Sequence, residues 1–462
     1  MFANTQMMGV QTPLGPGALG LARFGGTEAL SRLFSFQLDV YAPNTVENVA
    51  GALLGAPVSV NLEQRHFHGI CARVAQGASN TTHTPYTLEV VPKLWLLTVG
   101  RRSRSFAELS VPEIVTQVLE GQAVQLELRG GYDRRAYVVQ RNESDFDFVS
   151  RLLEEEGIFY FFRHSADGHT LVVADSPESH SALPAVQFDA DGERKRAETV
   201  YDWERTQELR AGKVTLRDHH FQLPDDPLEA TSLLPEHLRS PATEQLEIYD
   251  YPGDYAQRFD GVDPGGGDRP SELQKLLPAA ARAAELRMQA EAADAVTVAG
   301  ASSVRSLAAG AAFTLEGGFE GRYVLTSVTH SASRIADRLR YANTFTCIPD
   351  AVPFRPRRVT PRPVLAGTET AVVVGPPGEE VFADKYGRVR VKFHWDRSSG
   401  DDNSSTWIRV SQLATSGSFS LPEVGDEVLV AFEHGDPDRP VILGTLWNPS
   451  DPPPEREPRE ES

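Results

Sequence analysis

The sequence predicts a mainly β protein with a few helices, divided into several domains. Apolar and polar residues alternate at the period of a half-buried strand, most clearly in Val58–Glu63 and Val389–Trp395. Apolar residues at helical spacing occur in only a few stretches. At 462 residues, the chain exceeds the size of one hydrophobic core, so we expect about three domains.

The first 350 residues form one block that is rich in strand patterns. The clearest strands are expected at Leu33–Tyr41, Pro57–Val74 and Tyr86–Thr98. In Val58–Glu63 every second residue is apolar, which is typical of a sheet with one solvated face.

Helices are expected where a capping residue precedes an apolar stripe. Ser110 precedes the predicted helix Val111–Gly121. Ser144–Glu156 is the best predicted helix, because Ser144 and Asp147 form a box-like cap ahead of apolar residues at helical spacing. The strand Ile158–Arg163 follows at once.

The C-terminal part predicts a small antiparallel β-barrel. One face of its clearest strand is expected in the core and the other in solvent, with Val389, Val391, Phe393 and Trp395 alternating with Arg388, Arg390, Lys392 and His394. Gly435–Asp438 has turn chemistry and is expected to join two strands. We therefore expect Trp395→Ala to cost about 3–5 kcal/mol and Lys392→Ala under about 0.5 kcal/mol.

Three motifs follow one another along about four hundred residues. They are Asn142–Tyr160; Tyr249–Gly253 with the Ala-rich helix Ala279–Ala293; and Val381–Val391 (VFADKYGRVRV) with Trp395–Arg397, Asn403–Gln412 and Gly435–Gly444. Together they resemble the valine-glycine repeat protein G (VgrG) family, the spike hubs of type VI secretion systems and relatives of contractile phage tail hubs.

The resemblance implies four regions. Residues 1–348 are expected to form a phage tail hub-like region of two β-barrel-like subdomains with a helical insert, followed by a Pro-rich linker at 349–378. Residues 379–448 would form an OB-fold spike base, and 449–462 a disordered, acidic, Pro-rich tail. The linker also follows from the five prolines in Pro349–Pro363. Pro264–Pro270 is expected to be a flexible loop inserted in the hub.

The resemblance implies a mechanical function and no enzyme activity. Family members form a homotrimer that meets the hexameric tube of hemolysin-coregulated protein and baseplate proteins. They carry a PAAR tip or a separate needle protein, with effectors, and cross a membrane only by puncture. Two alternatives stay open. One is a hydrolytic tip enzyme that punctures cell walls, and the other is the hub of a phage tail or an extracellular contractile injection particle.

The sequence departs from the family in two places. After Trp447-Asn448 only Pro449–Ser462 follow, without a valine-glycine repeat, so we expect a hub without its own needle. The loop Ala414–Ser420 is less aromatic than its family counterpart.

Charge and cysteine content narrow the function classes. The net charge is −19, and Glu379–Trp447 holds twelve acidic residues against seven basic ones, which disfavours nucleic-acid binding. Cys71 and Cys347 are too few for a disulfide framework and fit a reducing compartment. No signal peptide or membrane-spanning run is found, so we expect bacterial cytoplasm first and then export by the contractile machine.

Patterns typical of binding sites have simpler interpretations. Gly15–Gly20 reads GxGxxG with Asp39 downstream, but no βαβ unit follows, so a tight turn is favoured over dinucleotide binding. His66 and His68 share a strand face but lack a third ligand, which favours half-buried or surface histidines over a metal clip. His219-His220 point to opposite faces of an extended chain.

Acidic residues also lack a catalytic arrangement. Glu154–Glu156 is expected on a solvated helix end, and Asp145 and Asp147 are explained by the helix dipole. The sequons at Asn80, Asn142 and Asn403 carry no weight in a chain made in a reducing compartment. We therefore predict no catalytic, cofactor-binding or metal-binding residues.

Overall fold

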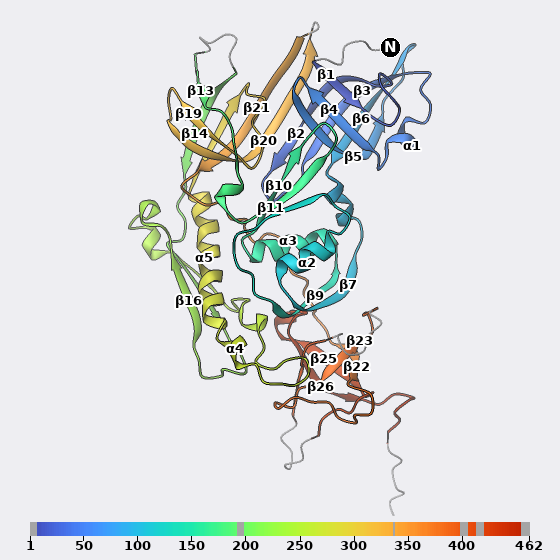
Figure 1. The fold of residues 1–462 in the computed structure, drawn as a ribbon, viewed down its shortest axis with the longest axis vertical. Helices are drawn as coiled ribbons and strands as arrows, with labels where there is room; N and C mark the ends of the chain where they lie inside the picture. Colours follow the sequence, from blue (N-terminus) through green and yellow to red (C-terminus); the bar gives the residue numbers. More distant parts are fainter. Residues whose placement is uncertain (1–6, 192–197, 336–337, 398–404, 413–419, 454–462) are drawn as a thin grey trace, which may run out of the picture.

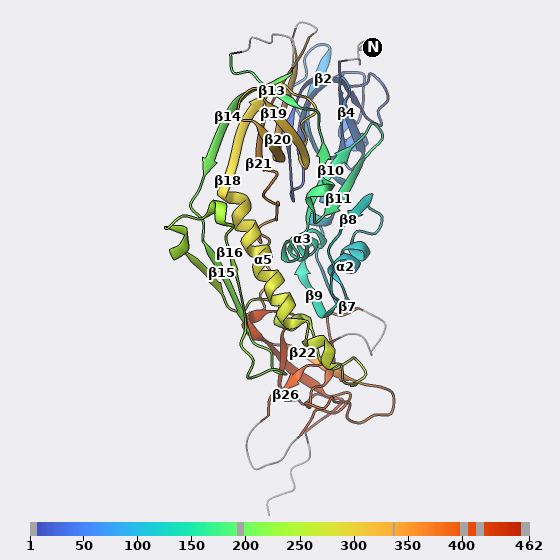
Figure 2. The same ribbon diagram turned by 60° about the vertical axis from the view of Figure 1, so that its left-hand side comes forward.

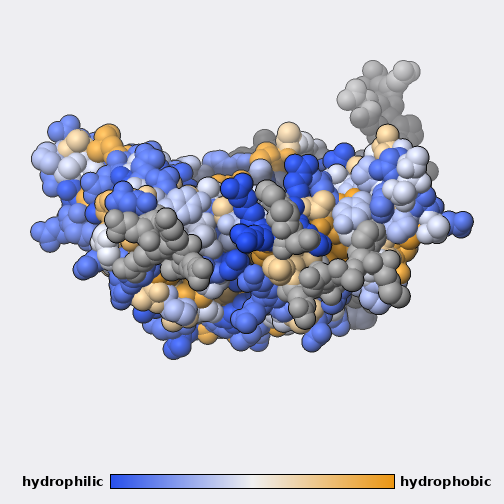
Figure 3. Space-filling model, turned by 90° about the horizontal axis from the view of Figure 1, so that it is seen from above, coloured by the Kyte–Doolittle hydropathy of each residue, from blue (hydrophilic) through white to orange (hydrophobic). Residues whose placement is uncertain are grey.

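The protein is long and narrow, with large β structures at one end and a small barrel at the other (Figure 1). The computed structural model describes residues 7–191, 198–335, 338–397, 405–412 and 420–453. Seen along its long axis, the molecule has an elongated outline whose surface is mostly polar (Figure 3). We call the described residues up to 349 the hub, 350–368 the linker, and the strands that follow the barrel.

The upper end of the hub is one continuous sheet that curls twice. Its first curl contains β1 (Met8–Gln11), β2 (Gly20–Ala29), β3 (Ser35–Pro43), β4 (Pro57–Leu62), β5 (Arg65–Gln76) and β6 (His83–Val91), in the spatial order β1-β4-β5-β6-β3-β2. The short helix α1 (Val49–Leu53) lies against β5. Alternate residues of β3 and β4 point inward, and Phe34, Phe36 and Phe67 are fully buried in this core.

The second curl closes on itself, because β19 pairs with both β13 and β20. It contains β12 (Ser181–Ala182), β13 (Val186–Phe188), β14 (Thr199–Gln207), β18 (Val296–Ser302), β19 (Ala311–Glu316), β20 (Gly321–Ile335) and β21 (Arg338–Pro349). The long hairpin β20–β21 joins the two curls, since β20 also pairs with β2.

A middle layer of helices and short strands lies below the sheet (Figures 1 and 2). It contains η1 (Lys93–Thr98), β7 (Arg102–Leu109), α2 (Val111–Val118), β8 (Val124–Glu127), β9 (Arg135–Glu143), α3 (Asp145–Glu155), β10 (Phe159–His164), β11 (His169–Ala174) and the turn η2 (Pro177–Ser179). Ser110 and Ser144 cap α2 and α3 as predicted, the first in a capping box with Glu113. Gly157, with φ of 66°, follows α3 in the left-handed conformation.

A three-stranded sheet with one long helix forms the flank of the hub (Figure 2). Its elements are β15 (Lys213–Asp218), β16 (Leu228–Leu233), β17 (Glu247–Asp250), the short helix α4 (Pro270–Leu273) and α5 (Leu276–Ala295), with turns η3 (Glu236–Leu238), η4 (Thr243–Gln245) and η5 (Ala256–Arg258). Helix α5 contains the predicted Ala-rich helix and packs on β15 and β16. Its alanines let the sheet approach closely.

The barrel is a five-stranded sheet of the order β23-β22-β25-β26-β24. The strands are β22 (Glu369–Val374), β23 (Arg390–Phe393), β24 (Arg409–Val410), β25 (Glu427–Phe432) and β26 (Pro440–Leu446), with η6 (Glu433–Gly435) between the last two. The predicted turn at Gly435–Asp438 does join two antiparallel strands. The barrel begins earlier than predicted, because β22 lies within the stretch 349–378 that was assigned to the linker.

Two predicted strands have different bounds. The stretch Pro57–Val74 is two strands, β4 and β5, joined by a turn at residues 63–64. The stretch Tyr86–Thr98 ends as a strand at Val91, because Pro92 lacks the N–H that a central strand needs. The apolar residues after it form η1 instead.

Candidate functional site

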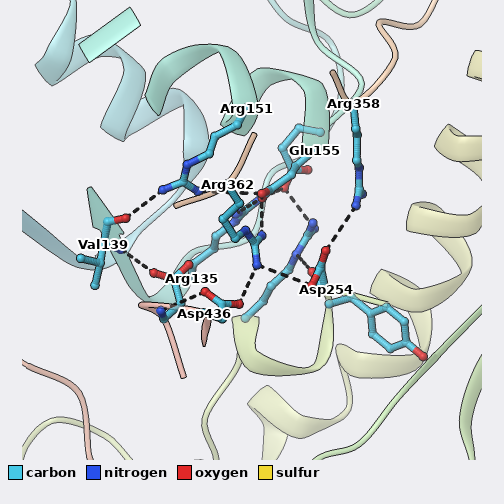
Figure 4. A network of polar contacts seen from close by, with 12 residues as sticks. Arg135, Val139, Arg151, Glu155, Asp254, Arg358, Arg362 and Asp436 are labelled. Carbon is cyan, nitrogen blue, oxygen red and sulfur yellow. Dashed lines mark hydrogen bonds and ion pairs between the residues drawn. The ribbon is translucent and has the colours of Figure 1, made fainter. Parts of the chain in front are cut away.

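The most elaborate polar arrangement of the described residues lies where the hub, the linker and the barrel meet. We call it the junction network, and it comprises Arg135, Arg151, Glu155, Glu156, Asp218, Asp254, Arg258, Arg358, Arg362, Asp436, Asp438 and Arg439. Figure 4 shows most of these side chains converging from α3, the segment after β17, the linker and the β25–β26 turn.

Arg362 of the linker is the central residue of the junction network (Figure 4). Its guanidinium donates to Glu155 Oε1 of α3 and to Asp436 Oδ2 of the barrel, each at 2.7 Å. Asp254 Oδ1 lies 3.5 Å away. One side chain of the linker therefore connects a hub helix to a barrel turn.

Glu155 is buried among several cations. Burial alone would raise its pKa, but the guanidinium groups of Arg362 and Arg135 outweigh this and hold the pKa of Glu155 well below its ordinary value. Arg135 also contacts Glu156, which is itself buried. The expectation of a solvated face for Glu154–Glu156 is therefore wrong for its last two residues. Glu154 accepts hydrogen bonds from the linker at Val359 N and Thr360 N, both 2.9 Å.

The turn between β25 and β26 reaches into the hub. Asp438 Oδ1 accepts from Val139 N of β9 at 2.6 Å, and the Arg439 guanidinium lies 3.3 Å from Asp218 Oδ2 of β15. Burial, and then the neighbouring Asp436 carboxylate, raise the pKa of Asp438 to about 7.

A second set of contacts joins the barrel to another part of the hub. Arg388 donates to the hub residue Asp260 through two hydrogen bonds of 2.6 and 2.9 Å, and to Asp384 at 2.7 Å. Its guanidinium lies over the Phe221 ring, 4.9 Å from the centroid. The prediction that Arg388 and Arg390 face solvent is wrong, because the hub covers this side of the strand and both are buried.

The loop Pro264–Pro270 belongs to this second set. Trp407 Nε1 donates to Asp263 O at 2.7 Å, and Lys385 pairs with Asp268 at 2.6 Å. Asp263 Oδ1 accepts from Gly265 N and Gly267 N, at 2.8 and 2.9 Å. The loop predicted to be flexible is thus a defined turn that lies against the barrel.

A third contact between the barrel and the hub involves Trp395. Its indole Nε1 donates to Glu369 Oε2 at 2.9 Å, and Arg141 of the hub binds the same carboxylate at 2.6 Å while lying over the indole ring. The ring also stacks on the buried Phe393. Trp395 is only partly buried and has a hub partner, which the alternation of its strand did not indicate.

Paired buried charges of this kind contribute little net stability but penalise any other arrangement, since a displaced partner leaves a buried charge alone. The three contacts hold the barrel in one orientation on the hub.

The predicted histidines lie in different surroundings. His66 is half-buried on β5. His68 Nδ1 contacts His169 Nδ1 at 3.1 Å, and the backbone N of His68 donates to His164 Nδ1. His220 is buried against Phe259 O, while His219 is more exposed. Across the described ranges, no three His, Cys, Asp or Glu side chains are placed to hold a metal ion.

Other predicted positions have structural surroundings. The GxGxxG stretch forms the turn between β1 and β2, as favoured, and Asp39 pairs with Arg23. Asp145 is bound by Arg104 and Gln140, and Asp147 by the capping Ser144. Cys71 and Cys347 are buried and free.

The sequons fall at exposed or partly exposed chain positions or outside the described residues. Asn80 caps its own turn by accepting from Thr82 N and His83 N, and Asn142 lies at the end of β9. Asn403, most of Ala414–Ser420, and most of the tail 449–462 lie outside the described residues. No described helix has the length and apolarity needed to cross a membrane.

The residues that sequence reasoning missed are the charged partners at the junction. Asp260, Arg362 and Asp436 lie in loops without periodicity, so nothing local marks the first and last as buried or Arg362 as their neighbour in the junction network. The spacing of arginines within the Pro-rich stretch was the one available signal.

Two family profiles match the chain in succession. Residues 27–335 match the phage tail baseplate hub (GPD) family, and residues 366–447 match the type VI secretion system and phage-baseplate injector OB domain. The order of a hub followed by an OB-fold barrel agrees with the described fold.

Curated relatives and solved structures point to the same family as the two profiles. The chain is 36% identical to the type VI secretion system spike protein VgrG1b of Pseudomonas aeruginosa, over 96% of this chain and 61% of that protein. It is 37% identical to VgrG1a of the same organism, over 96% and 70%. The E. coli c3393 protein, a type VI secretion component with structural similarity to phage T4 gp27 and gp5, matches with a TM-score of 0.67 at 23% identity, over 95% and 100%.

Proposed function

Since this chain belongs to the VgrG family of type VI secretion system spike proteins, we propose that it is the structural spike hub of such a machine. Three copies would assemble around a common axis and cap the hexameric tube of hemolysin-coregulated protein. Baseplate proteins would surround the hub, and the barrel end would carry a PAAR tip or a separate needle protein with effectors.

The observation that supports this proposal is the set of ion pairs that joins the hub to the barrel at separate places. A spike pushed from one end must pass the thrust to its tip without bending. Arg362 ties a hub helix to a barrel turn, and Arg388 ties the barrel to Asp260 on another part of the hub. Because these two contacts lie at separate places, the barrel cannot rotate about one of them without breaking the other.

We propose a revised division into regions. The hub would end with β21 at Pro349. The barrel would begin near residue 366 instead of 379, because β22 is one of its strands and the OB profile starts at residue 366. The linker is then short, and its arginines Arg355, Arg357, Arg358 and Arg362 lie against α3, α5 and their surroundings.

The proposed role requires no enzyme activity. The relatives at 36% and 37% identity are named spike proteins, which favours a structural role over a hydrolytic tip enzyme. Purified protein should therefore release nothing from peptidoglycan, chitin, lipid or nucleic acid. A reproducible activity abolished by one point substitution would overturn this part of the proposal.

The proposed location follows the proposed machine, with the protein in the bacterial cytoplasm until contraction exports it. The decisive experiment deletes the gene in its source bacterium and measures export of the tube protein into the medium. Export should stop and should return on complementation. Unchanged export in the deletion strain, with no second hub gene expressed, would contradict the proposal and favour a phage tail or an extracellular particle.

A further inference from the structure

Arg358 of the linker has a buried guanidinium atom without a hydrogen-bond partner. Within the described ranges, no acceptor lies within hydrogen-bond reach of its Nη2 atom. Its Nη1 atom lies 3.9 Å from Asp254 Oδ2, which is too long for a hydrogen bond. Figure 4 shows this as the one contact of Arg358. A guanidinium carries five N–H donors, and a buried donor without an acceptor costs free energy, so the group calls for a further partner.

The carboxylates nearest to Arg358 are bound by other arginines. Asp254 is shared with Arg362, whose Nη1 lies 3.5 Å from Asp254 Oδ1. Glu155 is held by Arg135 at 2.6 Å and by Arg362 at 2.7 Å. Among the described residues, Arg358 therefore has no carboxylate to itself.

The pKa of Arg358 reflects this shortage of negative charge. Burial lowers the pKa to about 10 against the attraction of Glu155, and the neighbouring cations Arg287 and Arg258 lower it further. Arg362 behaves in the opposite way, since its carboxylate partners outweigh burial and hold its pKa above the ordinary value. Two arginines of one linker thus differ in whether the chain neutralises them.

Arg358 lines a cleft between helix α5 and the linker. The cleft has a volume of about 310 Å³, and every residue that lines it belongs to the described part of the chain. Leu286 and Ala290 of α5 and Pro356 of the linker form apolar parts of its wall. Because Arg358 is 16% exposed at its side chain, a ligand in the cleft can contact it. Apolar walls strengthen the attraction between such a ligand and a charged group.

The other charged side chains of the cleft wall already have partners. Arg357 donates to Glu291 at 2.9 Å. Glu154 accepts from the backbone N atoms of Val359 and Thr360, both at 2.9 Å. The linker arginine with the unpartnered Nη2 is thus the group that a ligand would satisfy.

We propose that this cleft binds an oxyanion, a phosphate or carboxylate group, against Arg358. The planar guanidinium presents parallel N–H donors that fit two oxygens of such a group. Arg287 of α5, which donates to Asp250 at 2.5 Å, adds a second positive charge to the cleft wall. The bound oxyanion supplies the counter-charge that Arg358 lacks and fastens the linker to α5. This inference does not depend on the proposed function.

Thermal unfolding of the full chain tests the site. In phosphate or in acetate, the wild type should unfold at least about 2 °C higher than in chloride of the same pH and ionic strength, since a ligand of the folded state stabilises it. A rise in phosphate alone assigns a phosphate group, and a rise in acetate assigns a carboxylate. Arg358→Gln should abolish the rise. Arg340→Gln removes the same charge at an exposed position of β21 and should keep it.

Unfolding in chloride alone provides a second measurement. Without an oxyanion, Arg358→Gln removes a buried charge that lacks a partner, so the variant should unfold at or above the wild-type temperature. Arg362→Gln should unfold at a lower temperature, because it leaves Glu155 and Asp436 without a hydrogen-bonded cation.

Three results would overturn the inference. The first is a wild type that unfolds no higher in phosphate or acetate than in chloride. The second is an equal rise in Arg358→Gln and the wild type, because the anion would then act elsewhere. The third is a loss of stability in chloride that is as large for Arg358→Gln as for Arg362→Gln, which would show that the chain itself already neutralises Arg358. The spike-hub proposal stands under all three.

Discussion

Arg388 of the barrel and Asp260 of the hub form a two-pronged ion pair, with hydrogen bonds of 2.6 and 2.9 Å. Both side chains are nine-tenths buried or more. They are 128 residues apart in sequence, so the pair exists only when the barrel is seated on the hub. Because a two-pronged pair tolerates little displacement, it depends closely on the position of the barrel on the hub.

Asp260→Asn should destabilise the seated barrel by about 3–5 kcal/mol, because it leaves the Arg388 guanidinium buried without its main counter-charge. The measurement is limited proteolysis of the linker together with thermal unfolding of the full chain. Asp268→Asn, which alters an exposed ion pair on the same loop, is the matched control and should change neither. Equal effects of the two substitutions would show that Asp260 does not brace the junction.

Trp395→Ala should cost about 3 kcal/mol, at the low end of the sequence-based expectation, since the side chain is only partly buried. It removes the stack on Phe393 and the partner of Glu369. Trp395→Phe keeps the stack and loses the hydrogen bond, so it should cost about 1 kcal/mol. Denaturant unfolding followed by near-ultraviolet circular dichroism measures both. An alanine variant no less stable than the phenylalanine variant would refute the stacking role.

The helices were predictable because their signals are local. Ser144 and Asp147 specify the start of α3 and Gly157 its end, and the structure agrees with the predicted bounds within a residue. The same holds for the turn at Gly435–Asp438. Such signals act within a few residues and do not depend on what packs above them.

The contacts of the junction network were not predictable from the sequence. The alternation of apolar and polar residues indicates on which face of a strand a side chain lies, but it does not indicate what covers that face. Arg388 and Arg390 lie opposite the barrel core, which normally means solvent. Here the hub covers them, with Asp260 and the Pro264 carbonyl as partners. A contact between segments more than a hundred residues apart has no local signature in one sequence.

The hub should lose stability as the pH falls below about 6.5, through buried histidines. Burial lowers the pKa of His169 to about 4 and that of His164 to about 3. The unfolded chain, with ordinary histidines, takes up protons from about pH 6.5, whereas folded His169 and His164 do so only near pH 4 and pH 3. Folding is therefore penalised increasingly down to about pH 3. Above that window the histidines contribute no penalty.

A buried carboxylate near these rings acts in the same direction. Glu28 is held by His330 and Arg65, and its pKa is lowered despite burial, so it too favours folding less in acid. His68 and Lys93 also lie near His169, and Asp167 lies near His68. The test compares thermal midpoints from pH 7 to pH 4.5. His169→Gln should flatten the decline, whereas His237→Gln, at an exposed position, should leave it unchanged. A decline just as steep in His169→Gln would contradict the assignment.

Asp438 should produce the opposite pH dependence. Its pKa is raised to about 7 by burial and then by Asp436, so the folded state keeps a proton that the unfolded chain loses near pH 4. Stability is therefore lost as the pH rises from about 4 to 7, and the full penalty remains above 7. Asp438→Asn removes the penalty and keeps an oxygen that accepts from Val139 N.

The variant Asp438→Asn should thus be more stable than the wild type at pH 8, and by a smaller margin at pH 5. Thermal unfolding at the two pH values measures the difference. Asp436→Asn is the matched control on the same turn, and it should destabilise at both pH values because it removes a partner of Arg362 and Arg439. An equal shift of the thermal midpoint at pH 5 and pH 8 would contradict this prediction. It would mean that the Asp438 carboxyl does not titrate between these pH values and is buried in its charged form.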